Sequence, residues 1–166
     1  AIMIIFLLLF GQFKSLNQAT VVLLNLPLAL IGGVFAIFFT SGTLSIPAII
    51  GFISLFGIAT RNGMLLISRY NDLEREGYSK LECVMHGSLD RLNPILMTAL
   101  CSALALIPLA LAGDQSGNEI QSPMAKVILG GLLTSTFLNG FIIPIMYLIT
   151  ERKVVKKEIV EDDRIN

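Results

Sequence analysis

The chain has 166 residues, of which 54% are hydrophobic and only 14% are charged. Soluble globular domains carry about 25% charged residues, so this composition excludes an ordinary water-soluble domain and indicates a membrane protein. Twelve Lys and Arg residues balance twelve Asp and Glu residues, which excludes the basic surface of a nucleic-acid-binding protein. Two cysteines without a CxxC pair, together with a single histidine, indicate neither a disulfide framework nor a zinc site.

Apart from an incomplete run at residues 1–10, four apolar runs are long enough to cross a bilayer. A hydrocarbon core about 30 Å thick requires about 20 mostly apolar residues in a helix. The four runs carry only two charges, Arg61 and Lys126, and they span residues 21–39, 46–68, 95–112 and 125–149. The sequence therefore predicts an all-α membrane protein, a polytopic helical bundle with four complete transmembrane helices.

Residues 1–10 are also apolar, but ten helical residues reach only about 15 Å, which is half of a span. They lack the basic leader of a signal peptide, and no small-residue cleavage site follows them. We interpret them as the second half of a transmembrane helix whose first half is missing. The expectation that follows is that the chain is a fragment of a longer membrane protein.

The connection between the second and third complete spans contains a helix signal of its own. Ser79 is followed three residues later by Glu82, the pair that forms a capping box, and apolar residues then recur at helical spacing. This pattern predicts a cytoplasmic amphipathic helix over residues 79–92 that lies against the membrane or the bundle. Pro94 would begin the next span as a separate helix, since proline is tolerated in a first turn. Residues 151–166 are predicted to form a tail.

Lys and Arg residues are concentrated in one set of connections, as is typical of cytoplasmic loops. Ten of them fall in the first connection, in the stretch 69–94 and in the tail, whereas the loops 40–45 and 113–124 contain none. The predicted orientation places the tail in the cytoplasm and these two loops outside.

Arg61 is the residue that most needs explaining, because a charge within a span is rare and usually faces the protein interior or a water-filled cavity. It shares a narrow small-and-polar helix face with Gly57, and Asn62 lies beside it. Two interpretations remain open: Arg61 faces the interior, or it snorkels toward the cytoplasmic headgroups. A similar stripe runs from Arg91 through Thr98 in the next span, and small-residue helix packing would also explain it.

Small and polar residues recur every four positions in the last span, at Gly131, Ser135 and Asn139, with Gly130 alongside. This pattern favours close helix packing over a ligand site, and Gly57 is predicted to pack helices in the same way. The methionines are scattered, so no metal ligands are identified, and no cofactor is predicted. The spans contain no Ser/His pair, paired Asp or His/Glu set, so the chain is not expected to be an enzyme.

Three runs resemble a known family: GFISLFGIATRNGMLLISRYNDL, RLNPILMTAL and GNEIQSPMAKVILGGLLTSTFLNGFIIPIMYL. They are similar to the C-terminal membrane half of the resistance-nodulation-division efflux transporters, especially the heavy-metal branch, up to about Arg152. The resemblance implies a trimeric, proton-driven pump of the Gram-negative inner membrane. Its partners would be membrane lipid, the missing N-terminal half, a periplasmic adaptor and an outer-membrane channel.

The resemblance also implies roles for Arg61, Arg91 and Thr98, and Asn62 is a further relay candidate because it lies beside Arg61. In this family, aspartates of the N-terminal half exchange protons with basic and hydroxyl residues on the helices that correspond to residues 46–68 and 95–112 here. A lysine of the drug-exporting branch matches Arg61, beside Asn62, and an arginine and a threonine of its RLxPILMT motif match Arg91 and Thr98. Arginine stays charged at essentially any pH, so Arg61 would pair with carboxylates without carrying protons. The alternatives are a fragment of a drug-exporting pump, or an accessory subunit that pairs with a separate N-terminal half.

Overall fold

The computed structural model describes residues 2–40, 42–113 and 115–165, and side chains as far as residue 150. Over these residues the chain forms helices and no strands. The helices are α1 (Ile2–Phe13), α2 (Leu16–Thr40), α3 (Ile46–Arg75), α4 (Lys80–Leu111) and α5 (Gln121–Ile165). Four of them, α2 to α5, have the length and apolar composition needed to cross a membrane, and α1 is too short. The predicted all-α fold with four complete spans and a short first helix is confirmed.

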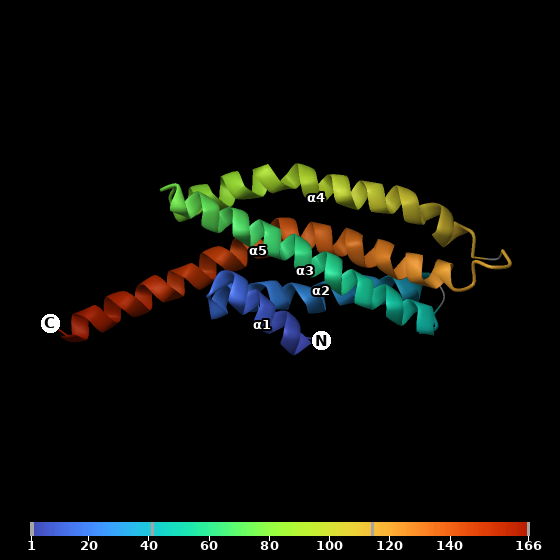
Figure 1. Ribbon diagram of the computed structural model, residues 1–166, viewed down its shortest axis with the longest axis horizontal. Helices are drawn as coiled ribbons and strands as arrows, with labels where there is room; N and C mark the ends of the chain where they lie inside the picture. Colours follow the sequence, from blue (N-terminus) through green and yellow to red (C-terminus); the bar gives the residue numbers. More distant parts are fainter. Residues whose placement is uncertain (1, 41, 114, 166) are drawn as a thin grey trace.

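The long helices lie side by side, and α5 occupies the centre (Figure 1). It packs against α2, α3 and α4, while α1 packs against α2. The α1–α2 and α3–α4 connections lie at one end of the bundle, and the α2–α3 and α4–α5 loops lie at the other. Helices α3 and α5 therefore run parallel to each other and antiparallel to α2 and α4. Beyond residue 150, α5 continues without a break as far as Ile165, past the ends of the other helices.

The turn between α3 and α4 is built from residues with specific backbone roles. Gly77 has a φ of 93°, a left-handed conformation that side-chain-bearing residues rarely adopt. Helix α4 then begins with the capping box that the sequence predicted. The backbone N–H of Glu82 donates to Ser79 Oγ at 3.4 Å, and the backbone N–H of Ser79 donates to Glu82 Oε2 at 3.0 Å.

Helix α4 differs from the expectation of two separate helices over residues 79–92 and 95–112. It runs as one helix through Pro94, and Figure 1 shows it as an arch. Proline removes one backbone N–H, which frees the carbonyl of Asp90, but membrane helices tolerate this because neighbouring groups can satisfy the freed oxygen. Helices α2 and α5 likewise continue through Pro27 and Pro144.

Glycines bring α2 and α5 into close contact. A Cβ atom on Gly130 of α5 would overlap the Cβ of Ala36 in α2 and lie 3.0 Å from the carbonyl oxygen of Gly32. A Cβ atom on Gly131 would overlap the buried side chain of Leu55 in α3. By contrast, a Cβ atom on Gly57 would meet nothing within 4 Å. Of these glycines, only Gly57 faces open space within the described part of the chain.

Helix α4 is the least enclosed of the four long helices. Only 6% of its most apolar stretch is buried, compared with 28% to 39% for the other three. Large apolar side chains such as Met97, Leu100 and Leu104 are exposed along it. Much of its surface is therefore available for lipid or for other protein segments.

Candidate functional site

Arg61 and Asn62 lie at the middle of α3 but face different environments. Arg61 is exposed, whereas Asn62 is 6% exposed and packed inside the bundle. Among the side chains that the structure describes, Arg61 has no ion-pair partner, and the ion pair that is present joins Arg69 to Asp90. The guanidinium group therefore lies on a face of α3 that the described helices leave open.

Arg91 and Thr98 lie on α4, which is antiparallel to α3. The Tyr70 hydroxyl of α3 and the Ser88 hydroxyl of α4 are 2.6 Å apart and fix the register of the two helices. Arg61 precedes Tyr70 by nine residues and Thr98 follows Ser88 by ten, so at about 1.5 Å per residue both lie about 14–15 Å from that contact. Thr98 is thus level with Arg61, while half-buried Arg91 lies nearer the α3–α4 turn.

The hydroxyl group of Thr98 is exposed and donates to the carbonyl oxygen of Pro94 at 2.9 Å. This local bond holds the side chain against its own helix, a common arrangement for threonine in apolar surroundings. The structure therefore brings Arg61 and Thr98 to the same level, but within the described part of the chain no side-chain hydrogen bond or ion pair joins any two of the four predicted site residues.

Three buried carboxamides form a second polar feature, one on each of three packed helices. Asn25 of α2, Asn62 of α3 and Asn139 of α5 are 1%, 6% and 0% exposed. A Cβ atom on Gly63 would lie 3.8 Å from Asn25 Nδ2 and 3.4 Å from Ile143 Cδ1, so α2, α3 and α5 meet at this level. Asn139 is one helical turn before Ile143, which places all three carboxamides at a similar depth.

These carboxamides are incompletely satisfied. Within the described residues, both polar atoms of Asn25, the Nδ2 of Asn62 and the Oδ1 of Asn139 have no hydrogen-bond partner. Polar side chains inside a membrane are expensive and are typical of transport pathways and functional sites. Sequence reasoning assigned Asn139 to a packing face and overlooked Asn25, although an asparagine within an uncharged span was a visible signal.

A network of side-chain hydrogen bonds ties α2, α3 and α5 together near the α1–α2 connection. Gln18 and Asn71 exchange two amide hydrogen bonds, of 2.8 Å and 2.9 Å. The Tyr147 hydroxyl lies 3.4 Å from Asn71 Oδ1 and 3.3 Å from Glu74 Oε2. The bonded partners are 53 to 76 positions apart in the chain, so no local spacing pattern could have indicated the network.

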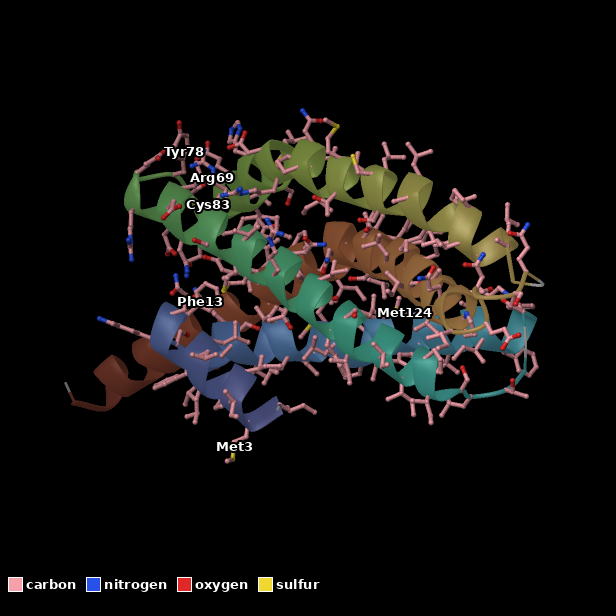
Figure 2. The ribbon with its side chains drawn as sticks, turned by 45° about the vertical axis from the view of Figure 1, so that its right-hand side comes forward. Met3, Phe13, Arg69, Tyr78, Cys83 and Met124 are labelled. Atoms are coloured by element: carbon pink, nitrogen blue, oxygen red, sulfur yellow. The ribbon has the colours of Figure 1, made fainter. Side chains whose placement is uncertain are left out.

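The same end of the bundle joins α3 to α4. Arg69 Nη2 and Nε donate to Asp90 Oδ2 at 2.8 Å and 3.1 Å. A Cβ atom on Gly87 would lie 2.5 Å from the ring of Tyr70, so only glycine allows this close approach. Figure 2 shows Arg69 at the same end as Tyr78 and Cys83, far from Met124 at the opposite end. Hydrogen bonds between polar side chains therefore join the helices at this end, whereas the unsatisfied carboxamides of Asn25, Asn62 and Asn139 lie in the middle of the bundle.

The described residues contain no group of three or more His, Cys, Asp or Glu side chains that could hold a metal ion. Cys83 is buried and Cys101 is exposed, and both are free thiols.

Residues 1–151, nearly the whole chain, match the AcrB/AcrD/AcrF family. The chain belongs to this family. Its relatives include the cobalt-zinc-cadmium resistance protein CzcA of Cupriavidus metallidurans, which is 39% identical over 153 residues, covering 92% of this chain and 14% of CzcA. Protein HelA of Legionella pneumophila is 45% identical over 147 residues, covering 87% of this chain and 14% of HelA.

The fold agrees with this family assignment. A crystal structure of a heavy metal efflux pump superposes with a TM-score of 0.82 at 39% identity, covering 91% of this chain and 15% of that one. The resemblance to the heavy-metal branch of the resistance-nodulation-division transporters is confirmed. The chain spans only 14% of the length of the first relatives that it matches.

Proposed function

We propose that this chain is part of the membrane domain of a proton-driven pump that exports heavy-metal cations. The observation that carries the proposal is the 39% identity to a cobalt-zinc-cadmium resistance protein across 92% of the chain. The superposition on a heavy metal efflux pump also supports it, since the helices of the two chains are arranged alike. In this proposal the chain binds and moves protons and ions without catalysing a covalent reaction.

Within the pump, this chain would contribute the C-terminal half of the proton-relay helices. Arg61 and Asn62 of α3, and Arg91 and Thr98 of α4, are the proposed relay and ion-pair residues. Arg61 supports this role because it is exposed at mid-helix without an ion-pair partner among the described side chains. An unpaired arginine at mid-membrane costs about 2.5–3.5 kcal/mol on insertion scales, so a carboxylate from elsewhere in the pump would stabilise it.

We also propose a location and an assembly. The pump would lie in the inner membrane of a Gram-negative bacterium as a homotrimer, joined to a periplasmic adaptor and an outer-membrane channel. The α3–α4 turn and the C-terminus would face the cytoplasm, because the basic residues are concentrated there. The exposed surface of α4 is compatible with contacts to other parts of such an assembly.

Deleting the gene that encodes this chain is expected to lower tolerance to metals such as cobalt, zinc, cadmium or nickel, and the intact gene should restore it. The measurements are growth across a metal series and the metal content of the cells. Tolerance to dyes and organic drugs serves as the control. A loss of drug tolerance with unchanged metal tolerance would favour the drug-exporting alternative, and no change in either would contradict an efflux role.

The orientation can be tested by cysteine labelling in a background from which Cys83 and Cys101 have been removed. A thiol introduced by Ser116→Cys, in the α4–α5 loop, is expected to react with an impermeant reagent added from the periplasm. A thiol introduced by Lys157→Cys is expected to react only after the membrane is permeabilised. Labelling with the opposite sidedness would show that the orientation is wrong.

A further inference from the structure

Five residues form a clasp between α3 and α4: Arg69 and Tyr70 on α3, and Gly87, Ser88 and Asp90 on α4. It lies at the α3–α4 end of the bundle, where Figure 2 labels Arg69. Tyr70 is fully buried, its hydroxyl lies 2.6 Å from Ser88 Oγ, and its ring would be 2.5 Å from a Cβ atom on Gly87. Arg69 donates two hydrogen bonds to Asp90. The clasp therefore fixes α4 on α3 both along its axis and around it.

Tyr70 is itself held in place by the other helices. The ring centroids of Tyr70 and Tyr147 of α5 are 5.0 Å apart, within the usual range for an aromatic pair. The Tyr147 hydroxyl lies within hydrogen-bond distance of Asn71 and Glu74 of α3, and Asn71 exchanges two hydrogen bonds with Gln18 of α2. Contacts with α2, α3 and α5 thus determine where Tyr70 meets α4.

Arg91 lies directly beyond the clasp on α4. It follows Ser88 by three residues, which places it on nearly the same helix face and about 4.5 Å farther along the axis. Pro94 separates Arg91 from Thr98, but no proline lies between Ser88 and Arg91. A shift or rotation of α4 at Ser88 therefore carries Arg91 with it.

We propose that Tyr70 and Ser88 are positioning residues, whose hydroxyl pair holds α4 in the register that places Arg91 in the proton relay. This role rests on the proposed function, in which Arg91 is a relay and ion-pair residue. Position matters for such a group, because a misplacement of about 1 Å can lower the rate of a step up to about 100-fold. Tyr70 and Ser88 act through Arg91, without touching the metal or carrying the protons of the relay.

The test uses the whole pump that contains this chain, in proteoliposomes with an imposed pH gradient. Zn²⁺, Co²⁺, Cd²⁺ or Ni²⁺ is supplied, and the rate is expressed per metal-binding molecule, counted by calorimetric titration, so that inactive protein does not lower kcat. Tyr70→Phe keeps the buried ring and removes only the hydroxyl group. We expect its kcat to fall about tenfold while KM stays within about twofold, because the relay is displaced and metal binding is not changed.

Ser88 supplies independent variants on the other side of the contact. Ser88→Ala is expected to lower kcat as Tyr70→Phe does, and the double variant should be no slower than either single variant, because both remove the same hydrogen bond. Ser88→Thr keeps a hydroxyl group. Ser88 borders a cavity of about 190 Å³ between α3, α4 and α5, which leaves room for the added methyl group, so this variant should retain most of the kcat.

Tyr78→Phe is the matched control, since it removes a tyrosine hydroxyl from the α3–α4 turn, outside the clasp, and should leave kcat and KM unchanged. Wild-type kcat in folded Tyr70→Phe and Ser88→Ala pumps would overturn the positioning role and leave the proposed function intact. A raised KM with unchanged kcat would also overturn it. A wild-type pump that moves none of the four ions would contradict the proposed function, and the positioning role with it.

Discussion

Replacing Arg61 with alanine is expected to abolish the metal tolerance that the intact pump confers, while the amount of protein in the membrane stays the same. The proposed carboxylate partner would lose its compensating charge, and an uncompensated buried carboxylate binds its proton more tightly. Proton release to the cytoplasm would then fail, and transport with it. Growth in a metal series and immunodetection of the membrane fraction provide the two measurements.

Two control variants define what the result means. Arg61→Lys keeps a positive charge and is expected to retain part of the activity, although lysine cannot present the planar fork of donors that arginine offers to a carboxylate. Arg75→Ala removes the same side chain from the exposed end of α3 and should leave tolerance unchanged. Wild-type tolerance of Arg61→Ala would instead support the interpretation that Arg61 snorkels to the headgroups.

The spans were predictable from the sequence because the bilayer imposes a length and a composition that a single segment must satisfy by itself. The capping box of Ser79 and Glu82 was predictable for the same reason, since its partners are three residues apart. The sequence could not predict that α4 continues through Pro94. Proline is compatible with a helix start and with a helix interior, and only the packing around Pro94 decides between them.

The contacts between helices could not be predicted from the sequence either. The pairing of Gln18 with Asn71, and the meeting of α2, α3 and α5 at Gly63, depend on the register between helices. Spacing placed Arg61 on a polar stripe but could not say that Asn62 is the buried member of the pair. A helical period shows which residues share a face, and the neighbouring helices determine which face is covered.

The glycines illustrate this limit and lead to a prediction about stability. Spacing suggested that Gly57, Gly130 and Gly131 pack helices, and the structure places them in different surroundings. Gly130 lies against Ala36 and the backbone of Gly32, whereas Gly57 has open space around it within the described residues. The same substitution should therefore have opposite effects at Gly130 and at Gly57.

Gly130→Ala is expected to destabilise the bundle strongly. The added methyl group overlaps the Cβ of Ala36, a side chain too short to move aside, so α2 and α5 must separate along their contact. Overpacking of this kind costs about 1–3 kcal/mol, which exceeds the gain of up to about 1 kcal/mol that alanine brings over glycine in a helix. Unfolding in a denaturing-detergent titration, followed by circular dichroism, measures the change.

Gly57→Ala supplies the matched control, since it adds the same methyl group to a helical glycine with nothing within 4 Å. Here only the propensity gain acts, so stability should be unchanged or higher by up to about 1 kcal/mol. Equal destabilisation by the two substitutions would show that another segment covers Gly57. No destabilisation by Gly130→Ala would contradict the close α2–α5 contact, because a Cβ atom at that position cannot coexist with Ala36 at the observed helix separation.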